Sequence, residues 1–268
     1  YEGEEPEIKQ QFMNWFGPSD PNCIINGNTT ICPNDIVYGW NLSSIYRQKE
    51  EPTFFHIYNI NSELDLISIR GTGSWADIVQ DVALYSEVVS IQLFSLILPL
   101  TSWFPLSFIQ DQVYFSGEFA GWVAPHLREG FYEPVYEYIA TNLSHKLART
   151  SNFTNSVVVV GHSLGAGLAH MVSSRFAFNG ISNVYSFGLS PPGSLYSAKK
   201  FGFLRPHLDK TTLTIKPNRD PVTMVDTHGG NVQALECNAD SGLSCHSSQR
   251  SFCQLRNDCN NYNFIRNK

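Results

Sequence analysis

The segment 161–165 reads Gly-His-Ser-Leu-Gly and has the form G-x-S-x-G. It follows a run of β-branched residues at 157–160 and precedes residues 168–178, whose composition is compatible with a helix. Where a strand turns sharply into a helix, flanking glycines avoid the clash that a Cβ would cause. The sequence therefore predicts that Ser163 stands at the carboxyl end of a strand, above a helix N-terminus, as a candidate nucleophile. The alternative is an ordinary glycine-rich turn.

Strand-like and helix-like segments alternate along the chain. Short strands are expected at residues 53–58, Leu64–Ile69, 157–160, 184–187 and 213–215. Residues 131–147 carry apolar side chains at helical spacing and predict an amphipathic helix. This alternation predicts an α/β fold with a largely parallel central sheet wrapped by helices. Residues 1–50 are expected to be irregular, and the length fits one domain over 1–268.

The composition narrows the class of protein. Lys and Arg number 18 against 24 Asp and Glu, a net charge of −6 that argues against nucleic acid and against strong attraction to anionic lipid. The six cysteines show no zinc-site spacing, so a zinc site is not expected. We expect three disulfides between sequence neighbours, with Cys23–Cys32 as one pair. The serine chemistry considered below needs no metal or organic cofactor. An even cysteine count favours an oxidising, secreted or lumenal compartment. Four N-glycosylation sequons point the same way, at Asn28, Asn41, Asn142 and Asn152.

A serine nucleophile needs a histidine base within hydrogen-bond reach and a carboxylate that orients the base. At a strand-turn-helix site of this kind the chain order is serine, acid, histidine. Asp220 is favoured as the acid because it follows the predicted strand 213–215, where a loop leaves the strand's carboxyl end. Asp209 precedes that strand, and Asp226 lies further along and stays possible.

Two histidines follow Asp220 in the sequence. His228 comes only eight residues later, so reaching Ser163 would require a tight excursion of the chain. His246 follows Cys245, and a disulfide at the adjacent residue would hold the loop in one geometry. We favour His246 as the base, with His228 as the alternative. Packing or surface positions are expected for five other histidines: His56, His126, His145, His162 and His170.

Stabilising an oxyanion requires two N–H donors. The residue after the nucleophile, Leu164, is one candidate. The second is expected in the turn after the strand Leu64–Ile69, where Thr72 offers both an N–H and a hydroxyl.

Residues 88–108 are nearly free of charge. Pro99 interrupts the apolar run after roughly a dozen residues, which is too short for a transmembrane helix. A buried helix followed by a loop is one interpretation. We favour a mobile cover, about residues 82–115, that shields the nucleophile in water and lays its apolar face on a lipid surface when open.

The motif at 161–167, together with Ile69-Arg70-Gly71-Thr72 upstream, resembles the class 3 lipase family of α/β-hydrolases, which cleave acyl esters of glycerolipids. Residues 190–195 are similar to the diacylglycerol-lipase-type members in particular. The pair Cys245-His246 after a Gly-Gly segment is similar to vacuolar lipases. The resemblance places the oxyanion-hole hydroxyl on Thr72 and the family's acid segment on Asp220-Pro221-Val222.

The resemblance implies a lipid acyl-ester hydrolase, a lipase for mono-, di- or triacylglycerols, with Ser163, Asp220 and His246 as its triad. Its expected partner is a lipid at a membrane or droplet surface, contacted peripherally through the cover, with a disulfide-stapled C-terminal segment at about 229–268. The alternatives are a phospholipase A-type hydrolase, an acyltransferase, and a catalytically silent lipid-binding protein on the same fold.

Overall fold

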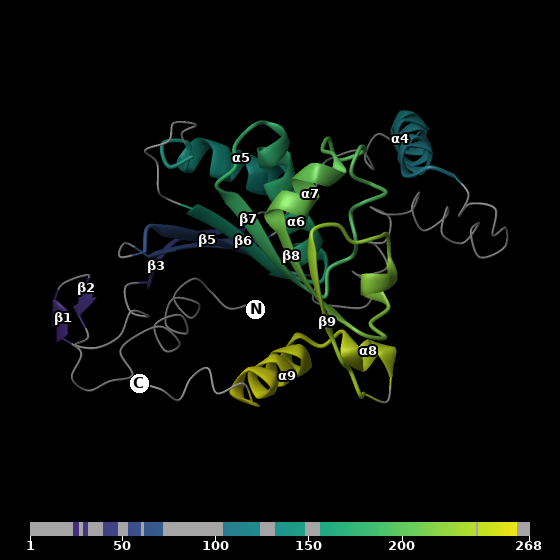
Figure 1. The fold of residues 1–268 in the computed structure, drawn as a ribbon. Coiled ribbons are helices and arrows are strands. Elements are labelled where there is room, and N and C mark those ends of the chain that lie inside the picture. Colours follow the sequence, from purple (N-terminus) through teal and green to yellow (C-terminus); the bar gives the residue numbers. More distant parts are fainter. Residues whose placement is uncertain are drawn as a thin grey trace.

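The computed structural model describes residues 24–26, 29–31, 40–47, 53–59, 62–71, 104–123, 132–147, 156–239 and 241–261. Its centre is a seven-stranded sheet in the order β3-β4-β5-β6-β7-β8-β9 (Figure 1). These strands are β3 (Trp40–Tyr46), β4 (Phe54–Asn59), β5 (Leu64–Ile69), β6 (Ser156–His162), β7 (Val184–Leu189), β8 (Thr212–Pro217) and β9 (Asn231–Leu235). A separate two-stranded sheet pairs β1 (Ile24–Asn26) with β2 (Thr29–Ile31).

Helical segments surround the central sheet. They are α4 (Leu106–Val123), α5 (Glu133–Asn142), α6 (Leu164–Phe178), α7 (Arg205–Thr211), the 3₁₀ turn η4 (Val222–Met224), α8 (Gly242–Cys245) and α9 (Ser248–Asn261). Helices α5, α6 and α7 lie over one face of the sheet, and α8 and α9 lie on the opposite side (Figure 1). The predicted α/β architecture, a largely parallel sheet wrapped by helices, is confirmed.

Strand direction decides where functional side chains can meet. β3, β4 and β5 pair antiparallel, whereas β5 through β9 pair parallel. The carboxyl ends of these five parallel strands therefore lie along one edge of the sheet. In α/β sheets this edge is where ligands bind.

The core lies between the sheet and the helices α5, α6 and α7. Alternate side chains of β4 and β5 point into it, and Phe54, Ile67 and Ile69 are almost fully buried. From the helix side, Ile139 of α5 and Phe176 of α6 are equally inaccessible to water. Burial of such large apolar side chains is the main favourable contribution to the stability of the layer.

Three sequence expectations differ from the structure. Within residues 1–50, expected to be irregular, β1, β2 and β3 are strands. β1 and β2 have only three residues each, and in β3 a register shift between Leu42 and Ser44 breaks the alternation that marks a strand. β9 was not predicted, and its first four residues are exposed at the sheet edge, so it carries no buried pattern. The amphipathic helix expected to reach residue 147 ends at Asn142, and the chain continues through turns.

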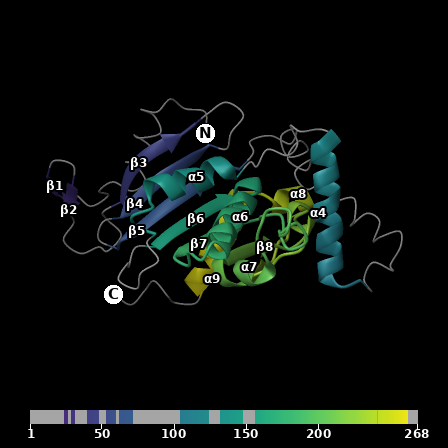
Figure 2. The ribbon, with the colours of Figure 1, turned by 90° about the horizontal axis from the view of Figure 1, so that it is seen from above.

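The predicted cover, residues 82–115, falls within the described chain only from residue 104 onward. This part belongs largely to α4, which lies toward the right of both views and, in Figure 1, above the sheet, whereas α8 lies below it (Figures 1 and 2). Gln110 of α4 donates a hydrogen bond to the Leu195 carbonyl, and Val113 is buried. Phe108 and Phe115 are 43% and 61% exposed, so α4 presents aromatic side chains to solvent.

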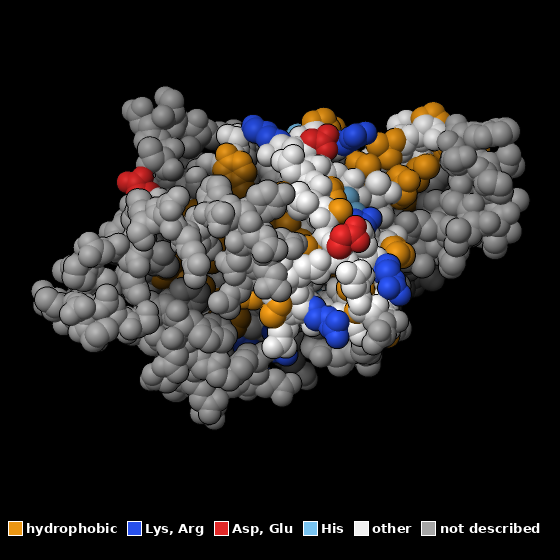
Figure 3. Space-filling model, turned by 60° about the horizontal axis from the view of Figure 1, so that its bottom comes forward, with side chains coloured by type: hydrophobic (Ala, Val, Ile, Leu, Met, Phe, Trp, Pro, Cys, Tyr) orange, Lys and Arg blue, Asp and Glu red, His pale blue; other side chains and the backbone are white. Residues whose placement is uncertain are grey.

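Among the described residues, no helix is both long and apolar enough to cross a membrane. Figure 3 shows one face of the molecule, on which Lys and Arg side chains of the described residues are scattered among hydrophobic, polar and acidic groups. The organisation of residues 1–268 as one domain stays a prediction.

An ionic network around the buried Asp65 joins the hairpin β4–β5 to α5 and to the turns that follow it. The Asp65 carboxylate, 1% exposed, is 2.8 Å from His56 Nε2 and accepts hydrogen bonds of 2.8 and 2.9 Å from Lys146 Nζ. His56 also contacts the Tyr138 hydroxyl through Nδ1. Burial alone would raise the pKa of Asp65, but the His56 and Lys146 hydrogen bonds and charges outweigh it and lower the pKa below 3.8.

We expect Asp65→Asn to lower the free energy of unfolding by about 2 kcal/mol, because Lys146 then lacks its counter-ion. A lowered folded-state pKa means that the carboxylate's contribution is complete above pH 3.8, the unfolded-state value, and is lost as pH falls below it. Urea unfolding at pH 7 and at pH 3 measures both effects.

The matched control is Asp111→Asn, which removes an Asp–Lys pair whose side chains are each 43% exposed. Exposed pairs contribute about 0–1 kcal/mol, so this variant should unfold close to the wild type. Equal effects of the two substitutions would contradict a special contribution of the buried network.

Candidate active site

The turn from β6 into α6 holds Ser163 in an unusual backbone conformation. Ser163 has φ of 59° and ψ of −131°, a region that non-glycine residues seldom adopt. A Cβ on Gly161 would lie 2.3 Å from the Gly165 carbonyl carbon, and one on Gly165 would lie 2.6 Å from the Ile69 carbonyl oxygen. The two glycines of the motif are therefore required for β5, β6 and α6 to approach each other this closely.

Ser163, His246 and Asp220 form a continuous chain of hydrogen bonds at the carboxyl edge of the sheet. His246 Nε2 is 2.8 Å from Ser163 Oγ. His246 Nδ1 is 2.9 Å from Asp220 Oδ2 and 3.1 Å from Oδ1. All three residues are buried, and Asp220 is fully inaccessible. Sequence order alone left the acid and the base open, and the structure brings Asp220 and His246 to Ser163.

Two loops hold the acid and the base against one another. Asp220 follows β8, and its Oδ1 accepts a further hydrogen bond from the Val222 N–H. Arg219 donates to the Ala239 carbonyl, which joins the acid's loop to the segment before α8. A Cβ on Gly242 would lie 2.6 Å from the Arg219 carbonyl oxygen, so α8 packs directly on this loop. These contacts fix His246, the residue after α8, above Asp220.

A disulfide joins Cys237 to Cys245, the residue before His246. Both cysteines are sequence neighbours, as predicted. The third predicted pair is wrong, because Cys253 is a free, exposed thiol on α9. Its remaining neighbour, Cys259, lies six residues along the same helix, a rise of about 9 Å that no disulfide spans. The predicted pair Cys23–Cys32 lies outside the described residues.

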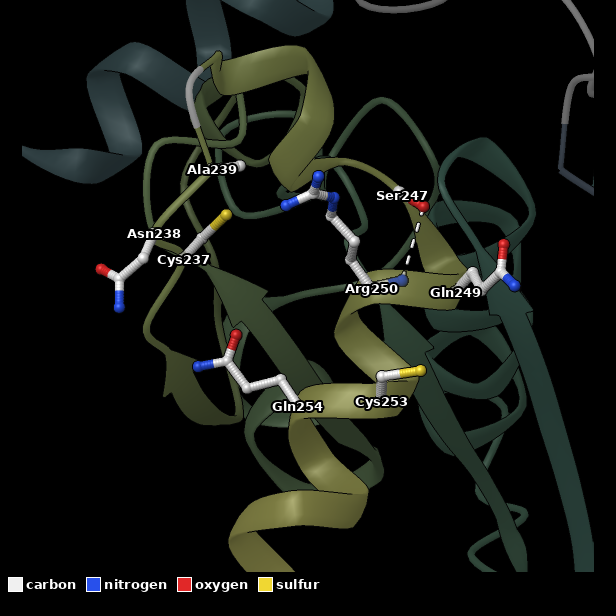
Figure 4. Close-up of a pocket in the computed structure, with 8 residues that line it drawn as sticks. All are labelled: Cys237, Asn238, Ala239, Ser247, Gln249, Arg250, Cys253 and Gln254. Carbon is white, nitrogen blue, oxygen red and sulfur yellow. Dashed lines mark hydrogen bonds between the residues drawn. The ribbon is translucent and has the colours of Figure 1, made fainter.

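A hollow of about 660 Å³ lies between this disulfide and the start of α9. Cys237 and Cys253 line different sides of it, with the Arg250 side chain drawn between them (Figure 4). Its lining residues do not include Ser163, Asp220 or His246. The hollow is therefore separate from the hydrogen-bonded chain at the sheet edge.

Of the two candidate oxyanion donors, Leu164 lies within the described residues and Thr72 does not. Leu164 is the first residue of α6, so its backbone N–H has no partner one turn earlier in the helix. Thr72 lies outside the described residues. The preceding residue, Gly71, is described, and a Cβ on it would lie 3.4 Å from Ser163 Cβ. The chain after β5 thus passes directly beside the serine, where the sequence predicts the second donor.

The other candidate acids and base have different partners. The Asp209 carboxylate accepts a hydrogen bond from Gly230 N–H. Asp226 accepts hydrogen bonds from Tyr196 N–H and from the N–H and hydroxyl of Ser197, which holds the segment after β7. His228 Nε2 is 2.9 Å from the Thr223 carbonyl. None of these three side chains is hydrogen-bonded to Ser163 in the described structure.

The surroundings of Asp226 and His228 change the pKa values of their side chains. Burial raises the pKa of Asp226, although the hydrogen bonds that it accepts favour the charged form. Burial lowers the pKa of His228, against a hydrogen bond to the Thr223 carbonyl that favours the charged form.

Among the remaining histidines, His162 departs from a pure packing role. Its Nε2 is 2.8 Å from the carbonyl oxygen of His246. Sequence reasoning missed this contact, although the position of His162 directly before the nucleophile was a signal. His170, as expected, is a packing residue: it is buried between the Ser186 and Thr214 hydroxyls, and burial lowers its pKa to about 3. His126 lies outside the described residues.

The described residues contain no cluster of three or more His, Cys, Asp or Glu side chains that could hold a metal ion. The arrangement at the sheet edge instead joins a hydroxyl, an imidazole and a carboxylate in order. An imidazole in this position can take the hydroxyl proton, and the carboxylate fixes its tautomer and stabilises the imidazolium. Such a group is suited to nucleophilic attack on an acyl carbonyl.

Comparison with solved structures found several fungal lipases. A Rhizopus microsporus var. chinensis lipase is 15% identical, with 75% of this chain and 64% of that chain covered and a TM-score of 0.42. A Yarrowia lipolytica lipase is 14% identical (73% and 65% covered, TM-score 0.41). A Penicillium expansum triacylglycerol lipase is 16% identical (74% and 70% covered, TM-score 0.44). The chain thus spans less than two thirds of the first two lipases.

No match was found among curated protein sequences. The model of the lipase (class 3) family, in contrast, matches residues 66–229, which is more than half of the chain. The matched region runs from β5 past β8 and includes Ser163 and Asp220. The chain belongs to the class 3 lipase family, with an α/β-hydrolase fold.

Proposed function

We propose that this protein hydrolyses acyl esters of lipids, as a lipase for mono-, di- or triacylglycerols. The observation that carries the proposal is the buried chain of hydrogen bonds from Ser163 through His246 to Asp220. Membership of the class 3 lipase family supports the same reaction class, ester hydrolysis. The triad alone would also serve esterases and peptidases.

In the proposed mechanism Ser163 Oγ attacks the ester carbonyl while His246 Nε2 accepts the hydroxyl proton. The tetrahedral intermediate collapses, and His246 returns this proton to the departing alcohol, which leaves an acyl group on Ser163. Water then attacks the acyl group while His246 accepts its proton. His246 returns this proton to Ser163 Oγ as the bond to the acyl group breaks, and the fatty acid is released. Asp220 keeps the proton of His246 on Nδ1 and stabilises the imidazolium in both halves.

The negative oxygen of each intermediate needs donors that are already aimed at it. We assign this task to the backbone N–H of Leu164, at the positive end of the α6 dipole, and to Thr72. Support for the second donor comes from Gly71, which lies directly beside Ser163. No metal or organic cofactor takes part in these steps.

The proposed lipid contact is the cover at residues 82–115. Its described part supports this, because Phe104, Phe108 and Phe115 are between 43% and 61% exposed. Phe104 stacks on Phe108, with their ring centroids 4.7 Å apart. An exposed aromatic face of this kind is favourable against acyl chains. Helix α4 contains no Lys or Arg, so its face suits an uncharged lipid surface rather than an anionic one.

For the triad, we expect a fluorophosphonate probe to label the wild type and not Ser163→Ala. His246→Ala should lose turnover of a soluble ester by roughly 10⁶-fold, because Ser163 then lacks its base. Turnover and rate of labelling are measured on the same preparations.

His228→Ala is the matched control, since His228 is half-buried and also follows Asp220, and it should stay within about threefold of the wild type. Unchanged labelling of His246→Ala would exclude His246 as the base. A wild type that neither reacts with the probe nor hydrolyses esters would favour a silent lipid-binding protein.

For the cover, we expect the hydrolysis rate of wild type to rise sharply when an ester passes from monomers to aggregates. Phe108→Ser with Phe115→Ser should reduce this rise at least about fivefold, because less apolar surface reaches the interface. Hydrolysis of the monomeric ester should stay within about twofold.

Phe178→Ser serves as the control, because Phe178 is 49% exposed on α6, outside the cover. Deleting residues 88–106 should abolish the rise altogether. An undiminished rise in the deletion variant would show that the cover does not mediate interfacial contact.

We also propose a secreted or lumenal location. Support comes from the Cys237–Cys245 disulfide and from Asn142, whose sequon lies at the end of α5 with an exposed side chain. Mass spectrometry of protein recovered from its native cells should find the disulfide oxidised and a glycan on Asn142 that N-glycosidase removes. A reduced pair together with unmodified Asn142 would place the protein in a reducing compartment.

A further inference from the structure

His162 contacts the backbone of the proposed base from the strand that carries the nucleophile. It is the last residue of β6, and Ser163 follows it directly. Its Nε2 is 2.8 Å from the His246 carbonyl oxygen, and the two imidazole rings lie 4.8 Å apart at 39°. A carbonyl oxygen only accepts hydrogen bonds, so His162 Nε2 carries a proton and donates it.

The charge state of His162 fits this position. Burial lowers the pKa of His162, and the neighbouring His246 lowers it further, while its hydrogen bond to the His246 carbonyl and the charge of Asp220 act in the opposite direction. A neutral donor at this place secures the base without adding a positive charge beside it. This matters because His246 itself becomes positive during the proposed reaction.

Other contacts also hold the main chain at His246. Helix α8 has only four residues, and the His246 N–H donates to the Leu243 carbonyl at its end. The disulfide at Cys245 ties the loop to Cys237, which follows β9 at the edge of the sheet. The hydrogen bond from His162 is different, because it joins the main chain of the base directly to β6, the strand that ends immediately before Ser163.

We propose that His162 is a positioning residue, which holds His246 at hydrogen-bond distance from Ser163 by donating from Nε2–H to the His246 carbonyl. This inference rests on the proposed function of the triad and adds a residue to it. Through this bond the nucleophile and the base share one rigid support, β6. A base that drifts from Ser163 loses proton transfer in both acylation and deacylation, so the effect falls on kcat rather than on KM.

Two substitutions of His162 distinguish the effect of its N–H donor from the effect of its aromatic ring. His162→Phe keeps an aromatic ring against His246 but has no N–H to donate. His162→Gln loses the ring and places an amide N–H close to the position of Nε2. The control is His207→Phe, which removes a histidine that bonds the Leu204 backbone at the start of α7.

The experiment measures kcat and KM on a soluble short-chain ester, per site titrated by a fluorophosphonate, together with the thermal melting point. We expect His162→Phe to lower kcat roughly tenfold with KM unchanged, since small misplacements of a catalytic group are costly. His162→Gln should keep at least about half of the wild-type kcat, and His207→Phe should match the wild type. His162→Leu is a second variant without a donor, should the phenylalanine not be accommodated.

A kcat for folded His162→Phe or His162→Leu within twofold of the wild type would overturn the inference. An equal loss in His162→Gln would also overturn it, because the ring and not the donor would then matter. Both results differ from failure of the proposed function, in which the wild type itself shows neither ester turnover nor phosphonylation.

Discussion

The close approach of β5, β6 and α6 at the glycine pair is the constraint on which the rest of the structure depends. At Gly161 and Gly165 an added Cβ would lie within about 2.6 Å of backbone atoms, a distance that packing cannot absorb. Because the backbones meet here, Ser163 is forced into a positive-φ conformation and stands at the carboxyl edge of the sheet. Strain of this kind costs of order 1–3 kcal/mol and persists only where the surrounding fold imposes it.

The parallel arrangement of β5 to β9 explains how distant residues come to this edge. Each strand delivers the segment after it to the same side: Gly71 follows β5, Ser163 follows β6, Asp220 follows β8, and α8 follows β9. The loops are then tied to each other by polar contacts, such as Arg219 to the Ala239 carbonyl. The site is thus supported by the sheet below it and by bonds between its loops.

Several elements could be predicted from the sequence because their signals are local. The alternation in β5 and the β-branched run in β6 report burial of a strand, and the glycine pair reports the sharp turn after it. β9 and β3 were not predicted, because neither strand has a regular buried face. β9 is an exposed edge strand, and β3 contains a register shift. The third disulfide failed because α9 separates Cys253 from Cys259 along one helix.

The sequence by itself determined the family, the nucleophile candidate and the order of acid and histidine behind it. The sequence did not exclude His228 as the base or Asp226 as the acid, because sequence spacing does not specify which side chains meet. Only the tertiary structure shows which side chains meet. His246 contacts Ser163, 83 residues away in the sequence, and it contacts Asp220, 26 residues away. The tertiary structure also decided the place of His162, whose partner is a backbone carbonyl. The sequence shows that His162 adjoins the nucleophile, but it does not show which backbone carbonyl the side chain contacts, because a carbonyl has no side-chain identity.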